Sequence, residues 1–154
     1  MASMAPGPPR SVTGATRDTK PLRIVIAEDE AIVAVLLGEM LEALGHTVCA
    51  IEATELGLVM AATRLRPDLL VVDVQLRGGS GLVAMEHVLE IGFVPHVLIS
   101  GATVAMPSAG AVTLQKPFWE SDIVDAIARA LAAVPPADPV QLCARDAAGA
   151  SSPA

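Results

Sequence analysis

The sequence of 154 residues has few of the side chains that build most disulfide, metal and nucleic-acid sites. Its two cysteines, Cys49 and Cys143, are too few for a disulfide framework and lack the spacing of metal ligands. Its three histidines are scattered along the chain. Only ten lysines and arginines stand against 17 acids, and the net charge of −7 argues against binding to a nucleic-acid backbone. We therefore expect a basic partner or a bound cation, and no nucleic acid.

Long apolar runs are also missing. No run approaches the roughly 18 to 20 residues that a membrane-spanning helix needs, and the first ten residues, MASMAPGPPR, lack the apolar core of a secretory signal. We therefore expect a cytoplasmic protein without a membrane contact. The hydrophobic content of 53% nevertheless predicts one well-filled core.

Proline, glycine and small polar residues dominate both ends of the chain. Residues 1–20 and 135–154 bury too little apolar surface to offset the entropy of ordering, so we expect two disordered tails. Residues 21–134 remain as a single folded domain. Because the second tail is too short for a further domain, we expect this protein to act through protein contacts.

Between these tails, apolar strands alternate with helical patterns. Strands with few polar residues on either face predict a doubly wound α/β fold, in which helices cover both sides of a parallel sheet. Right-handed crossovers place the carboxyl ends of all strands at one edge, where we expect the functional site. The expected strands are 22–27, 46–52, 68–74, 94–101 and 111–116, and the expected helices are 30–44, 54–66, 81–91 and 120–134.

Charged residues follow several of these strands. Glu28, Asp29 and Glu30 come after the first strand, where acids also favour the start of a helix through its macrodipole. Asp73 lies within the apolar strand LLVVDV, and a buried carboxylate is costly unless another group compensates it. Lys116 ends the fifth strand. The carboxylates of Glu28, Asp29 and Asp73 would repel one another when crowded together, so the pattern predicts a cation at this edge.

The expected cation is Mg²⁺, which prefers a few carboxylate oxygens together with water and phosphate. An Asp73 carboxylate beside Mg²⁺ can attack a phosphoryl group and form an aspartyl phosphate. Lys116 and the hydroxyl of Ser100, at the end of the fourth strand, can then contact the phosphate oxygens.

Five positions resemble the signature of the receiver domain of two-component response regulators. They are the acid pair Glu28–Asp29, Asp73 in VVDVQLRGGSG, Ser100 in LISGA and Lys116 in LQKPF. The resemblance covers residues 22–134 and implies a flavodoxin-like sheet of five parallel strands in the order 2-1-3-4-5. The roles it implies are a phosphoacceptor at Asp73, phosphoryl contacts at Ser100 and Lys116, and Mg²⁺ ligands at Glu28, Asp29, Asp73 and the backbone carbonyl of Gln75.

Two features depart from the family pattern. Receivers usually carry an aromatic switch residue three positions before the lysine, where this chain has Thr113. The stretch GATVAMPSAGAVTLQ is too short for a normal fourth helix together with the fifth strand, so we expect that helix to be shortened or replaced by a loop. This pattern is similar to an atypical subgroup of stand-alone proteobacterial receivers. Because related regulators dimerise through that helix, we expect a monomer or a weak dimer.

The expected function is that of a single-domain response regulator rather than an enzyme. It would accept a phosphoryl group from a histidine kinase or phosphotransfer protein, and act on an unknown downstream protein or serve as a phosphate sink. One alternative is a pseudo-receiver, an interaction module that signals without phosphate. A Mg²⁺-dependent phosphatase is disfavoured because Gln75 stands where its second acid would be. Of the three consecutive acids, we expect Glu28 and Asp29 to face the site and Glu30 to cap the helix.

Overall fold

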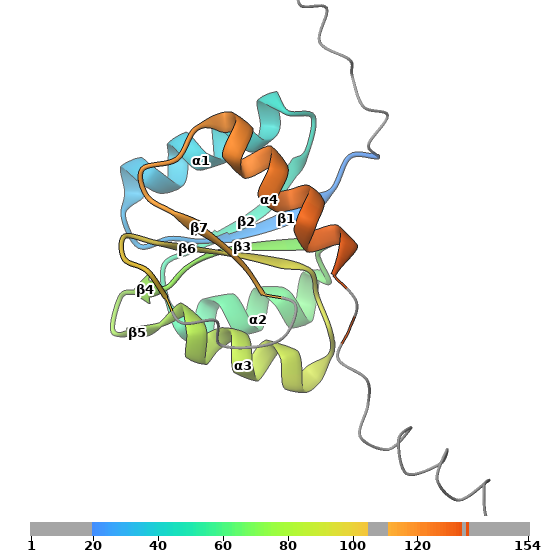
Figure 1. The fold of residues 1–154 in the computed structure, drawn as a ribbon. Coiled ribbons are helices and arrows are strands. Elements are labelled where there is room, and N and C mark those ends of the chain that lie inside the picture. Colours follow the sequence, from blue (N-terminus) through green and yellow to red (C-terminus); the bar gives the residue numbers. More distant parts are fainter. Residues whose placement is uncertain (1–19, 105–110, 134, 136–154) are drawn as a thin grey trace, which may run out of the picture.

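The computed structural model of the chain describes residues 20–104, 111–133 and 135. Five parallel strands form one sheet in the order β2-β1-β3-β6-β7, with helices on both faces (Figure 1). Counted along the chain within this sheet, β6 and β7 are the fourth and fifth strands, so the observed order is the predicted 2-1-3-4-5 of a doubly wound, flavodoxin-like fold. The strands of the sheet are β1 (Arg23–Ala27), β2 (Thr47–Glu52), β3 (Leu69–Asp73), β6 (His96–Ser100) and β7 (Val112–Gln115), and the helices are α1 (Ala31–Ala43), α2 (Glu55–Leu65), α3 (Gly81–Ile91) and α4 (Glu120–Ala132).

Two hydrophobic layers hold the helices to the sheet. Residues of α1 and α4 pack on one face, and residues of α2 and α3 pack on the other (Figure 1). Strand β1 shows how the sequence supplies both layers: Ile24 and Ile26 join the first, and Val25 and Ala27 join the second. Because side chains alternate across a strand, a sheet covered on both faces needs such uninterrupted apolar strands.

The predicted elements are present, with ends that differ from prediction by at most two residues. Gly45 follows α1 with a φ of 92°, the left-handed conformation expected of a glycine at that position. Helix α2 is capped at its start by Thr54, whose hydroxyl accepts a hydrogen bond from the N–H of Gly57 at 3.1 Å. Such local signals explain why the element boundaries could be read from the sequence.

A short hairpin directly after β3 was not predicted. Strands β4 (Gln75–Leu76) and β5 (Gly79–Ser80) pair antiparallel, and Gly78 between them has a φ of 69°. Two residues per strand are too few for a hydrophobic period to be visible. The glycines in RGGSG were the available signal, because they mark a tight turn.

Helix α1 carries apolar residues on its outer face as well as its inner face. Leu37 and Leu41 are buried against the sheet, whereas Ile32, Val35 and Leu36 are exposed by 77%, 54% and 58%. Packing in the core therefore accounts for the apolar residues on the inner face of α1, but not for those on its outer face.

The connection between β6 and β7 lies partly outside the described residues. Residues 101–104 and 111, its described part, contain no helix. The rest of the expected loop, residues 105–110, is not described, and neither is most of the two tails predicted at 1–20 and 135–154. Over the ranges that are described, each helix is too short or too polar to cross a membrane.

Candidate functional site

Three predicted site residues meet at the carboxyl edge of the sheet. Glu28 follows β1, Asp73 is the last residue of β3, and Lys116 follows β7. The Nζ atom of Lys116 lies 3.2 Å from Oε2 of Glu28 and 2.5 Å from Oδ2 of Asp73. The fold thus joins residues that stand 88 and 43 positions from Lys116 in the chain.

Each of the two acids also closes a tight turn with its second oxygen. Oδ1 of Asp73 accepts a hydrogen bond from the N–H of Gln75 at 2.8 Å, and Oε1 of Glu28 accepts one from the N–H of Glu30 at 3.0 Å. Both acids are buried, with exposed fractions of 6% and 3%. Lys116 and these amides supply the compensation that a buried carboxylate requires.

The pKa values of Glu28 and Lys116 are both raised, for different physical reasons. Burial raises the pKa of Glu28, and the neighbouring Asp73 adds to this rise, although the hydrogen bonds from Glu30 and Lys116 act against it. Burial would lower the pKa of Lys116, but its hydrogen bonds and attraction to Asp73 and Glu28 outweigh burial and raise that pKa. Lys116 is therefore a firmly charged ammonium between two acids.

Ser100 lies at the same edge, next to both Asp73 and Lys116. It follows Ile99, which pairs with Asp73 in the sheet, and its carbonyl accepts a hydrogen bond from the N–H of Lys116 at 2.8 Å. Its hydroxyl accepts one from the N–H of Ala102 at 3.2 Å. Ser100 therefore helps to place the backbone of Lys116, while its hydroxyl is bonded within its own loop.

Glu30 does not cap α1, so that prediction was wrong. Glu30 occupies the N-cap position, but its side chain makes no capping hydrogen bond and is exposed. The carboxylate of Glu28 binds the N–H of Glu30 instead. Glu28 can reach this N–H because it stands two residues earlier in a tight turn. At the N-cap position itself, the side chain of Glu30 is longer than those that cap a helix effectively.

The oxygens at this edge are of the type that a hard cation prefers, but in this structure they face the ammonium of Lys116. Carboxylate oxygens of Glu28 and Asp73 converge on one point, which is the chemistry that Mg²⁺ prefers. The charge at that point comes from Lys116, and within the described ranges no group of three His, Cys, Asp or Glu side chains is placed to hold a metal ion. Asp29, half-buried beside Glu28, and the carbonyl of Gln75 stay predicted ligands.

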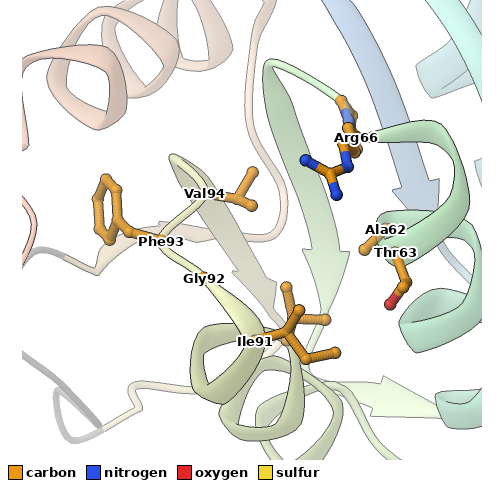
Figure 2. A pocket seen from close by; sticks show the side chains of 9 residues that line it. Ala62, Thr63, Arg66, Ile91, Gly92, Phe93 and Val94 are labelled. Carbon is orange, nitrogen blue, oxygen red and sulfur yellow. The ribbon is translucent and has the colours of Figure 1, made fainter.

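A cavity lies at the opposite edge of the sheet, away from these acids. Its volume is about 290 Å³, and it is lined by the ends of α2 and α3 and the segment before β6. Figure 2 shows Arg66 on the α2 side and Ile91 on the α3 side of it. Its lining contains no carboxylate, in contrast to the edge that carries Glu28 and Asp73.

Comparisons with known proteins point to one group of regulators. No family model matches the chain. It is 34% identical over 115 residues to the phyllosphere-induced regulator PhyR of Methylorubrum extorquens, across 70% of this chain and 43% of PhyR. It is 31% identical over 125 residues to the transcriptional regulatory protein PdtaR of Mycobacterium tuberculosis, across 75% of this chain and 61% of PdtaR. The chain thus spans about half the length of these two relatives.

A solved structure agrees with these sequence relatives. The PhyR response regulator REC domain of Erythrobacter litoralis aligns with a TM-score of 0.66 and 28% identity. The alignment covers 77% of this chain and 96% of that domain. The likeness therefore takes in nearly the whole of the compared domain and about three quarters of this chain.

Proposed function

We propose that this chain, which belongs to the receiver-domain family of two-component response regulators, accepts a phosphoryl group on Asp73 from a histidine kinase or phosphotransfer protein. The observation that supports the proposal most is the convergence of Lys116 on the buried carboxylates of Glu28 and Asp73. In the transfer, an oxygen of Asp73 would form a bond to phosphorus as the bond from phosphorus to the donor imidazole breaks. The chain is then a phosphoacceptor rather than an enzyme.

The residues around Asp73 have defined tasks in this proposal. The N–H of Gln75 fixes one oxygen of Asp73, which leaves the other facing Lys116. Lys116 can move from that oxygen onto the transferred phosphoryl group and neutralise part of its charge. Glu28, Asp29, Asp73 and the carbonyl of Gln75 would hold Mg²⁺, which when bound supplies charge neutralisation for the phosphoryl oxygens.

Ser100 offers a route from the phosphoryl group to the next loop. The phosphoryl group adds a charge close to −2, and a hydroxyl that turns toward it gives up the hydrogen bond from Ala102. Residues 101–104 would then respond to phosphorylation. This route needs no aromatic switch residue, and position 113, where receivers usually carry one, is a threonine. We propose that output is a protein contact or phosphate drainage in the cytoplasm, by a monomer or weak dimer.

Acetyl phosphate labelling tests this function. The full chain is incubated with acetyl phosphate and Mg²⁺, and its intact mass is followed with time. We expect one phosphoryl group on the unaltered chain and none on Asp73→Asn. The matched control is Asp125→Asn on the exposed face of α4, which should be labelled normally. Persistent labelling of Asp73→Asn would sink the assignment.

One observation favours an interaction module that works without phosphate. Lys116 already pairs with both buried acids, so the fold does not require a cation at this edge. Under this second candidate, neither Mg²⁺ nor beryllofluoride would change the spectrum of the protein. The unaltered chain would also stay unlabelled by acetyl phosphate.

A further inference from the structure

The β4–β5 hairpin after Asp73 is held closely against the phosphoacceptor. Its last strand leads into Gly81, whose N–H donates a hydrogen bond to the carbonyl of Val74 at 2.9 Å. A Cβ atom at Gly81 would overlap the carbonyl oxygen of Asp73. The hairpin therefore folds back so tightly that its end lies directly on the Asp73 backbone.

The other side of the hairpin is held by the start of α2. Oε2 of Glu55 accepts a hydrogen bond from the N–H of Ser80 at 3.1 Å. The same carboxylate lies so close to Gly79 that a Cβ atom there would overlap it. The N–H of Arg77 also donates to the carbonyl of Ala53, at 3.2 Å. The loop before α2 and the first turn of that helix thus anchor both ends of the hairpin turn.

The same corner of the fold also anchors the acid turn after β1. The N–H of Glu28 donates to the carbonyl of Glu52 at 2.9 Å, three residues before Glu55. The turn that carries Glu28 and the hairpin that follows Asp73 are therefore both hydrogen-bonded to one short segment, residues 52–55. The spacing of the two acids themselves is set by the pairing of β1 with β3, so this segment acts on the hairpin that follows Asp73.

A general helix effect does not account for the position of Glu55. An acid in the first turn favours a helix through its macrodipole, but the start of α2 is already capped by Thr54. The carboxylate of Glu55 instead bonds to Ser80, which is 25 positions away in the chain. This contact is specific to the hairpin.

We propose that Glu55 is a positioning residue for phosphorylation, which acts by holding the hairpin so that Asp73 and Gln75 keep their geometry. This inference rests on the proposed function, because the groups that it positions belong to the phosphoacceptor turn. The hydrogen bond of 2.8 Å between Gln75 and Asp73 lies at the start of the hairpin, so looser anchoring reaches it directly. A displacement of about 1 Å at a reacting group can cost about a hundredfold in rate.

Three variants of the full chain test the role of Glu55. In Glu55→Ala the acceptor is lost, and we expect the rate of labelling by acetyl phosphate and the affinity for Mg²⁺ each to fall by about fivefold or more. In Glu55→Gln the side-chain oxygen can still accept from Ser80, and most of the rate should return. Glu120→Ala removes a first-turn acid from α4 and is the matched control, with wild-type labelling expected.

The possible outcomes separate this inference from the proposed function. Wild-type labelling of Glu55→Ala overturns the role of Glu55 and leaves the phosphoacceptor function standing. Equal losses in Glu55→Gln and Glu55→Ala also overturn it, because charge rather than the hydrogen bond would then matter. If the unaltered chain is not labelled at all, both proposals fail. Hydrogen exchange at the Ser80 amide gives an independent readout: it should accelerate in Glu55→Ala only, and unchanged exchange contradicts the proposal.

Discussion

Replacing Lys116 with methionine should destabilise the fold in a way that a cation or a proton can reverse. The substitution keeps much of the side-chain volume but leaves the buried carboxylates of Glu28 and Asp73 without their shared ammonium. Loss of one partner from a buried ion pair costs about 3 to 5 kcal/mol. The side chain of Lys116 is 26% exposed, and the amides of Gln75 and Glu30 remain, so we expect the lower end, about 3 kcal/mol at neutral pH.

Urea denaturation with and without Mg²⁺ measures this effect. Mg²⁺ should restore part of the lost stability in Lys116→Met, because the cation can occupy the position between the two acids. Lys20→Met is the control, since Lys20 is exposed, and should change the free energy of unfolding by less than about 0.5 kcal/mol. A loss below about 1 kcal/mol in Lys116→Met, or no response to Mg²⁺, would refute this reasoning about the cluster.

Three further predictions concern neighbouring residues. The pKa of Glu28 is raised above its ordinary 4.5, so the folded protein binds this proton more readily than the unfolded chain does. The contribution of Glu28 to stability therefore falls as pH rises from 4.5 through the raised pKa. Glu28→Gln should lack this slope in denaturation curves taken across that pH range. Asp29→Asn should weaken Mg²⁺ binding, measured by calorimetry, far more than Glu30→Gln, and equal effects would contradict the assignment of Asp29 as a ligand. Gly81→Ala should lower the free energy of unfolding by about 1 to 3 kcal/mol through its overlap with Asp73, whereas Gly92→Ala at the other end of α3 should be neutral because a Cβ there meets no neighbour.

The fold and the shared edge could be predicted because they depend on patterns that are repeated along the chain. Strands such as 69–73, in which four apolar residues precede an acid, are buried on both faces, and an acid that ends such a strand must lie at the carboxyl edge. The strand pattern therefore predicts that Glu28, Asp73 and Lys116 share one edge. The pairing of Lys116 with both acids is not visible in that pattern, because it depends on side-chain reach and on the register of β6 with β7.

The parts that escaped prediction depend on short-range geometry. Glu30 and Glu28 are both glutamates near a helix start, and only the turn between them decides which carboxylate reaches the free N–H. The hairpin at 75–80 has no hydrophobic period, and its closeness to Asp73 follows from the missing side chain at Gly81. The contact between Glu55 and Ser80 joins two separate segments, and no pattern in either segment indicates that they lie together.

The most direct test of the account is to locate the phosphoryl group chemically. The full chain is phosphorylated with acetyl phosphate and Mg²⁺, reduced with borohydride so that an acyl phosphate becomes a homoserine residue, and digested for peptide mass analysis. We expect homoserine at position 73 and no modified peptide from Asp73→Asn. Homoserine at another acid, or an unmodified position 73 in a labelled protein, would contradict it.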